Sequence, residues 1–241
     1  MPDLRAVQWR GQPLSAVLFD LDGTLLDTAA DIALALNRTL TEFGCGALNE
    51  SEVRAMIGRG SPILIQRAAA ARGLAIDEPI QAAMVERFFH HYGRLEQLNE
   101  DTARPFPGAA EALRVLHGCG LRIAVVTNKQ HRFAAALLER LGLEAWVDEV
   151  VGGDTCALRK PDPQPLLFAC ESLRVPAYQS LMVGDSVNDV QAARAAGIAV
   201  VCVSYGYNEG RDPRSLDCDA LLDSLTELPA LLQARGLPTA P

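Results

Sequence analysis

The 241-residue sequence has no C-x-x-C pair, and its six cysteines are scattered along the chain. This spacing favours reduced thiols over a disulfide framework or a cysteine zinc site. The N-terminus also lacks a positively charged leader followed by an apolar segment, so nothing in the sequence indicates secretion. Together these absences predict a cytoplasmic protein.

Long hydrophobic runs are absent as well. The longest, such as residues 123–126 and 198–203, are far shorter than the roughly 20 residues that a membrane-spanning helix requires. Positive charge is scarce relative to negative charge, because the formal net charge is −8. Affinity for nucleic acid comes mainly from Lys and Arg side chains that neutralise phosphates. We therefore expect no membrane partner and no nucleic-acid partner, while the oligomeric state stays open.

The sequence does contain a recurring pattern of short apolar strands and helices. Nearly all-apolar strands, typical of buried parallel sheets, are expected at residues 16–19, 122–126, 146–151, 180–183 and 199–203. Helices are expected between them at residues 109–116, 133–141, 165–173 and 190–196. This alternation predicts an α/β fold, a doubly wound parallel sheet with a Rossmann-like core. Ligands of such sheets bind outside the carboxyl ends of the strands.

One long segment interrupts this pattern and contains no convincing strand. Asn49 and Glu52 form a capping-box pattern within it, and helices are expected at residues 28–43, 50–56, 61–71 and 79–98. The run PFPG at 105–108 marks the return to the α/β pattern, because proline and glycine disfavour a continuing helix. The sequence thus predicts an all-helical cap domain at residues 30–103, inserted into a catalytic core of residues 1–29 and 104–241.

The run Asp20-Leu21-Asp22-Gly23-Thr24 directly follows the first apolar strand. Residues two apart in a strand point to the same side, so Asp20 and Asp22 would be presented together where the strand ends. Two carboxylates so close need a cation, a shared proton or a substrate between them. Mg²⁺ is the favoured answer, because it takes oxygen ligands and commonly uses one or two carboxylates with water and phosphate.

Three further motifs each follow an apolar strand. They supply Thr127 with Asn128, then Lys160 in the run RKPDP, then Asp185 and Asp189 in the run MVGDSVND. Each motif has an ordinary structural explanation alone: a strand terminus, a solvated loop residue and a helix N-cap. The occurrence of all of them after strands of one βα series favours a catalytic site instead.

In order and spacing, the four motifs resemble those of the haloacid dehalogenase superfamily, and the resemblance covers nearly the whole chain. It implies a phosphomonoester hydrolase that acts through an aspartyl-phosphate intermediate with Mg²⁺ as cofactor. Asp20 corresponds to the nucleophile and Asp22 to the acid-base residue. Thr127 and Lys160 correspond to the other catalytic residues, which bind phosphoryl oxygens and supply positive charge.

The resemblance also implies binding roles. The metal would be held by Asp20, Asp185 and the backbone carbonyl of Asp22, while Asp189 supports the metal waters or Lys160. The segment after the nucleophile and the segment after the second strand would bind the phosphate, through Gly23, Thr24 and Asn128.

Two features distinguish among the chemistries of the superfamily. Its dehalogenases lack the second carboxylate, because a halide leaves without protonation, whereas Asp22 is present here. Its phosphonate-cleaving members use a lysine from the cap, whereas residues 30–103 contain no lysine. Phosphosugar mutases share the D-x-D pair and remain an alternative.

Within the superfamily, several segments are similar to those of bacterial phosphoglycolate phosphatases. They include DLDGTLLDTAAD at 20–31, MIGRG at 56–60, TNK at 127–129 and SYGY at 204–207. This similarity implies that a small phosphorylated metabolite, 2-phosphoglycolate, is cleaved to glycolate and phosphate. Arg59 offers a fork for the substrate carboxylate, or is simply an exposed arginine in a helix-helix turn. Phosphosugars and other small phosphomonoesters remain alternative substrates.

Overall fold

A six-stranded parallel sheet, in the order β10-β9-β8-β3-β6-β7, forms the centre of the protein. The computed structural model describes residues 7–95, 97 and 100–232. The doubly wound parallel sheet expected from the sequence is therefore confirmed. Its strands are β3 (Ala16–Phe19), β6 (Arg122–Val126), β7 (Glu149–Val151), β8 (Ser180–Gly184), β9 (Ala199–Val203) and β10 (Ala220–Leu222).

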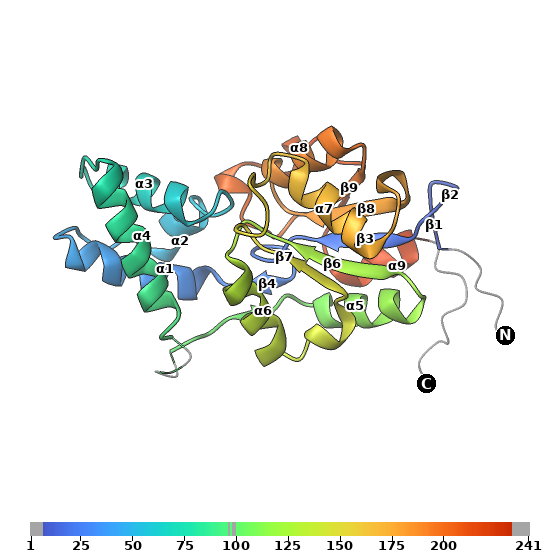
Figure 1. Ribbon diagram of the computed structural model, residues 1–241, viewed down its shortest axis with the longest axis horizontal. Helices are drawn as coiled ribbons and strands as arrows, with labels where there is room; N and C mark the ends of the chain where they lie inside the picture. Colours follow the sequence, from blue (N-terminus) through green and yellow to red (C-terminus); the bar gives the residue numbers. More distant parts are fainter. Residues whose placement is uncertain (1–6, 96, 98–99, 233–241) are drawn as a thin grey trace.

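The sheet is buried on both faces. Val17 and Phe19 pack into one apolar cluster, whereas Ala16 and Leu18 pack into another, because successive strand residues face opposite sides. A strand covered on both faces must be apolar throughout, which explains the unbroken apolar runs in the sequence. One face is covered by α5 (Ala109–Gly118), α6 (His131–Arg140) and α9 (Leu228–Leu231), and the other by α7 (Gln164–Leu173) and α8 (Val187–Ala196) (Figure 1).

The strand order reverses at β3. This strand pairs with β6 on one side and with β8 on the other, and Phe19 lies opposite both Val125 and Val183. The residues that follow the three strands must therefore meet at the same edge of the sheet. Such a reversal is where ligands bind in open α/β sheets.

Four helices form a separate body at the end of the molecule far from the termini (Figure 1). They enclose an apolar cluster of their own, which includes Leu36, Ile65 and Met84. The expected capping box is present, because the N–H of Glu52 donates to Asn49 Oδ1 at 2.9 Å. These helices are α1 (Ala29–Glu42), α2 (Glu50–Arg54), α3 (Ser61–Ala71) and α4 (Glu78–Tyr92).

A two-stranded antiparallel ribbon connects the two bodies. The chain leaves the sheet through β4 (Leu26–Asp27) and returns through β5 (Arg104–Pro105). Buried Asp31 at the start of α1 accepts hydrogen bonds from the N–H of Thr102 at 2.7 Å and from its hydroxyl at 2.8 Å. We propose on this basis that residues 30–103 form a cap domain.

Several short elements differ from the expectation. Trp146 lies in a 3₁₀ turn (Glu144–Trp146), so β7 is shorter than expected. The helix expected at residues 79–98 already ends at Tyr92, with Gly93 as its C-cap, and its expected last residue, Leu98, lies outside the described residues. The sequence did not indicate β10 or the ribbon of β1 (Gln8–Trp9) and β2 (Gln12–Pro13), whose strands are too short to show a period. None of the described helices combines the length and apolar character needed to cross a membrane.

Candidate active site

The carboxyl ends of three adjacent strands carry the polar residues expected from the sequence. Asp20 follows β3, Thr127 follows β6, and Asp185 follows β8. All three side chains are buried. They reach one place because β3 pairs in register with both neighbours, so the topology rather than the local sequence brings them together.

Asp20, Asp185 and Asp189 form an acidic cluster, in which one oxygen from each lies within 4.8 Å of the others. Burial raises the pKa of Asp20 well above its usual range, although the charge of Lys160 opposes this shift. Burial, together with the charge of Asp189, raises the pKa of Asp185 to about 7. Buried oxygen ligands that repel one another suit a hard divalent cation, which would relieve the repulsion.

Lys160 bridges two members of the acidic cluster. Its Nζ lies 2.9 Å from Oδ1 of Asp20 and 2.6 Å from Oδ1 of Asp189. Burial alone would lower the pKa of Lys160, but the charges of Asp189 and Asp20 outweigh burial and raise this pKa above its usual value. Asp189 also caps α8, because its Oδ2 accepts hydrogen bonds from the N–H of Ser186 at 3.0 Å and from its hydroxyl at 2.6 Å. Asp189 therefore fixes Lys160 relative to the first turn of α8.

Two glycines leave room for the carboxylate of Asp185. A Cβ on Gly23, whose φ is +94°, would lie 2.5 Å from Asp185 Oδ2, and a Cβ on Gly206 would lie 2.2 Å from Asp185 Cβ. Thr24 Oγ1 donates to Asp185 Oδ1 at 3.1 Å, and the N–H of Tyr207 donates to Oδ2 at 2.7 Å. Gly23 and Thr24, expected to bind substrate, thus lie against the acidic cluster.

The carboxylate of Asp22 is separate from the acidic cluster. Its Oδ1 accepts a hydrogen bond from Thr28 Oγ1 at 2.6 Å and lies 3.0 Å from Nζ of Lys129. Lys129 is a residue that the sequence analysis gave no role. A signal was available, because the chain contains only two lysines, Lys129 and Lys160, and each immediately follows or lies within a motif already singled out.

Thr127 and Asn128 lie between the sheet and the four helices. Thr127 Oγ1 accepts a hydrogen bond from the N–H of Lys129 at 3.2 Å. The amide nitrogen of Asn128 donates to the carbonyl oxygen of Gly58 at 2.9 Å and to that of Lys160 at 2.8 Å. Asn128 therefore connects the turn after α2 with the Lys160 loop.

Arg59 has a partner other than the acidic cluster. Its Nε lies 3.1 Å from Oε1 of Glu209, which also accepts a hydrogen bond from Arg67 at 2.9 Å. Glu209 belongs to the loop after β9, so this contact joins the cap helices to the core. The sequence analysis missed Glu209, because nothing in one sequence relates it to a distant arginine.

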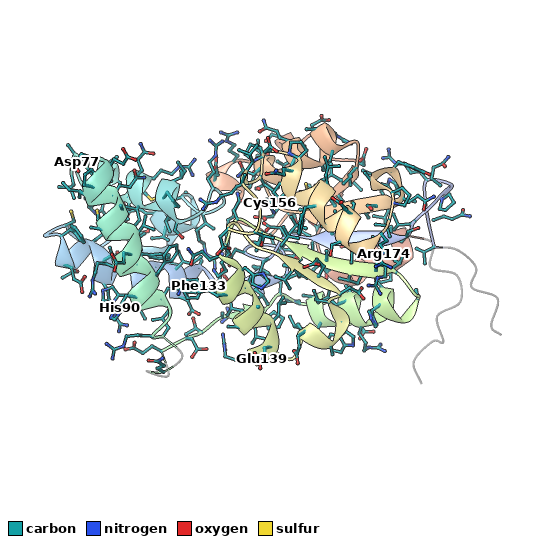
Figure 2. All side chains as sticks on the ribbon, viewed as in Figure 1. Asp77, His90, Phe133, Glu139, Cys156 and Arg174 are labelled. Carbon is teal, nitrogen blue, oxygen red and sulfur yellow. The ribbon has the colours of Figure 1, made fainter. Side chains whose placement is uncertain are left out.

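A cavity of about 50 Å³ separates the acidic edge of the sheet from α3 and α4. By the space that one water needs, it holds a few water molecules or a small ligand. Phe133 at the start of α6 faces α4 across this boundary (Figure 2), and its ring centre lies 5.1 Å from that of Tyr92. The described lining residues include Asp20, Asp22, Ile57, Gly58, Leu64, Phe88, Tyr92, Thr127, Asn128, Lys129 and Phe133.

Comparisons with known proteins give consistent results. The family model described as haloacid dehalogenase-like hydrolase matches residues 17–203. A phosphoglycolate phosphatase of Nitrosospira multiformis is 45% identical, with 92% of this chain and 96% of the relative covered. A plasmid phosphoglycolate phosphatase of Cupriavidus necator is 46% identical, with 95% and 97% covered. Among solved structures, a predicted phosphoglycolate phosphatase from Haemophilus somnus has 32% sequence identity and a TM-score of 0.84. The match covers 90% of this chain and 97% of that protein.

Proposed function

This chain belongs to the haloacid dehalogenase-like hydrolase family, and we propose that it hydrolyses 2-phosphoglycolate to glycolate and phosphate. Its similarity to several phosphoglycolate phosphatases identifies it as a phosphoric monoester hydrolase. The observation that carries the proposed reaction is the joint burial of Asp20, Asp185 and Lys160 at the edge of the sheet. A carboxylate nucleophile, a metal-binding acid and a cation are the groups that a phosphoryl transfer to Asp20 needs.

The buried acids fit Mg²⁺. Asp20, Asp185 and the backbone carbonyl of Asp22 would hold the ion, which when bound would supply positive charge that offsets the repulsion between the carboxylate nucleophile and the phosphate. Lys160 supplies a second positive charge, with its Nζ 2.9 Å from Oδ1 of Asp20. Asp189 keeps that ammonium in place and thereby supports the site without contacting the substrate.

In the first step, an oxygen of Asp20 forms a bond to phosphorus while the bond from phosphorus to the bridging oxygen breaks. Asp22 donates a proton to that leaving oxygen, because an alkoxide is a poor leaving group near neutral pH. The phosphoryl oxygens would be bound at this edge of the sheet by the Thr127 hydroxyl and by backbone N–H groups. The residues proposed to bind them are Gly23, Thr24, Thr127 and Asn128.

In the second step, water attacks the phosphorus of the aspartyl-phosphate. Asp22, now ionised, takes the proton from this water, and the carboxylate of Asp20 leaves. Splitting the transfer in two lets the same pair of acids serve both steps. Apolar residues of α3 and α4, such as Leu64 and Phe88, form the cap side of the cavity beside Asp20.

The test is phosphate release with Mg²⁺ present, measured as kcat/KM for 2-phosphoglycolate and for a panel of phosphosugars. A preference of tenfold or more for 2-phosphoglycolate, equivalent to about 1.4 kcal/mol, is expected. A smaller preference, or an equal rate with a chelator present, contradicts the proposal.

A further inference from the structure

The cavity holds one lysine side chain that the proposed mechanism does not use. Among the described lining residues, Lys129 is the one with a cationic side chain, and 8% of that side chain is exposed. Its Nζ lies 3.0 Å from Oδ1 and 3.2 Å from Oδ2 of Asp22. The same nitrogen lies 4.5 Å from the centre of the Tyr92 ring. A buried ammonium is unfavourable unless anions or ring faces hold it, so Asp22 and Tyr92 keep Lys129 at this position.

Both lysines of the chain lie at the candidate active site. They are Lys129 and Lys160, and all other basic side chains except histidines are arginines. Lys160 is occupied by Asp20 and Asp189 at 2.9 and 2.6 Å. Lys160 is not among the described residues that line the cavity, so Lys129 is the lysine that a ligand entering from the cap side would meet.

A second polar group, the hydroxyl of Tyr92, lies beside Lys129 at the cavity wall. The hydroxyl of Tyr92 is buried next to the ammonium of Lys129, and no other described residue forms a hydrogen bond with it. Tyr92 lines the same cavity as Lys129 and comes from α4 of the cap. A buried ammonium and a buried hydroxyl side by side at the wall of one small cavity favour a ligand group that accepts several hydrogen bonds and carries negative charge.

We propose that Lys129 binds the carboxylate of the substrate and shares its ammonium between this carboxylate and Asp22. An ammonium has three N–H donors, so both anions can be held together. The inference rests on the proposed function and deepens it. In 2-phosphoglycolate, the carboxylate is one methylene group away from the bridging oxygen that Asp22 protonates. The group that recognises this carboxylate must therefore lie next to Asp22, as Lys129 does.

Arg59 does not meet this requirement. It is not among the described residues that line the cavity, and its guanidinium is 3.1 Å from Glu209. Its side chain is 41% exposed, in contrast to the buried ammonium of Lys129. Lys129 thus takes the recognition role that the sequence suggested for Arg59.

The experiment compares two substrates that differ only in the carboxylate, 2-phosphoglycolate and ethyl phosphate. Both have a poor alkoxide leaving group, so both need Asp22, and the ratio of their kcat/KM values reports recognition of the carboxylate. In Lys129→Met, this ratio is expected to fall at least tenfold from the wild-type ratio. Arg59→Met is the matched control and is expected to change the ratio less than threefold.

The outcomes separate this inference from the proposed function. A wild-type preference for 2-phosphoglycolate that survives in Lys129→Met overturns the inference and leaves the proposed function standing. Equal losses on both substrates also overturn it, since they would mean that Lys129 only positions Asp22. A wild type with no preference between the two substrates overturns the proposed substrate and this inference together.

A binding measurement keeps the test valid if Lys129→Met does not fold. Asp20→Asn, labelled with ¹⁵N-lysine, has two lysine Nζ signals to observe, and Lys129→Arg in this background assigns them. With Mg²⁺ present, the Lys129 signal is expected to shift more during titration with 2-phosphoglycolate than with ethyl phosphate. Equal shifts overturn the inference.

Discussion

The core and the cap hold their charges in different ways. At the edge of the core sheet, Asp20, Asp185, Asp189 and Lys160 are all buried; oxygens of the three acids lie within 4.8 Å of one another, and Lys160 forms ion pairs with Asp20 and Asp189. The cap instead has an apolar centre. Apart from Asp31, which is buried where α1 begins, the charged side chains that form ion pairs within the cap are partly exposed. Its arginines reach across to core acids: Arg54 to Asp27, and Arg59 and Arg67 to Glu209.

The two kinds of charged contact differ in how much free energy is lost when they are broken. Buried charges of the core are fixed by strand pairing, and removing one partner leaves another buried charge uncompensated. The cap-core ion pairs involve partly exposed arginines, and such pairs contribute about 0–1 kcal/mol each. Contacts of this strength can break and re-form at little cost, which a cap that opens to admit substrate would require.

The largest effect is expected when the buried core is changed at its nucleophile. Asp20→Asn should lower turnover by roughly 10⁴-fold or more, because an amide cannot accept the phosphoryl group. Circular dichroism should show an unchanged fold, since the amide retains the shape of the side chain. Phosphate release from 2-phosphoglycolate checks this prediction, and residual activity within a hundredfold of the wild type would contradict it.

A smaller effect is expected at Asp22, on the boundary between core and cap. Asp22→Asn should slow hydrolysis of alkyl phosphates by roughly 10²–10⁴ through loss of acid-base help. The loss should be smaller for p-nitrophenyl phosphate, whose leaving group needs no proton. Calorimetric Mg²⁺ binding provides the control and should survive, because the acidic cluster does not include this carboxylate. Lost Mg²⁺ affinity would instead identify the side chain as a ligand.

The sequence predicted the core part of this comparison well. Asp20, Thr127 and Asp185 each follow an apolar strand directly, so one structural rule, that parallel strands share a carboxyl edge, places all of them. Lys160 and Asp189 could be located to the same region for the same reason. Only their mutual contact, at 2.6 Å, required the structure.

The contacts between core and cap could not be predicted in this way. Glu209 and Arg59 are far apart in the chain, and no periodicity relates them. Tyr207 donates its N–H to Asp185 and its hydroxyl to Asp27, and thus joins the acidic cluster to the ribbon that leads into the cap. Such pairings depend on how two separately packed bodies fit together, which hydrophobic patterns do not encode.

The packing difference between the two bodies can be tested in the cap interior. Met84→Ala should destabilise the cap by about 2–5 kcal/mol, because Met84 is fully buried within the cap cluster. Hydrogen exchange should rise in α1 to α4 and stay nearly unchanged in β3, β6 and β8. This pattern would support the proposed cap domain at residues 30–103.

Leu18→Ala is the matched core variant, since Leu18 is equally buried in the sheet. It should raise exchange in the central strands, with about the same energetic cost. If Met84→Ala and Leu18→Ala raised exchange across the whole chain alike, the core and the cap would unfold as one cooperative unit, and the proposed division would be wrong.

The smallest effect is expected at the ion pairs that join the two bodies. Glu209→Gln removes a charge that faces Arg59 at 3.1 Å and Arg67 at 2.9 Å while it keeps the size of the side chain. If the cap opens and closes during turnover, a loss of about 0.5–1 kcal/mol would shift the ratio of closed to open molecules roughly two- to fivefold. We expect kcat/KM to fall by this factor at low ionic strength and the difference from the wild type to shrink at high salt, where exposed charges are screened.

Glu139→Gln, on the exposed face of α6 (Figure 2), is the control and should leave kcat/KM unchanged. Because the three buried acids of the core stay intact in both variants, a loss in Glu209→Gln that does not respond to salt would place the effect of Glu209 in the core chemistry rather than in cap closure.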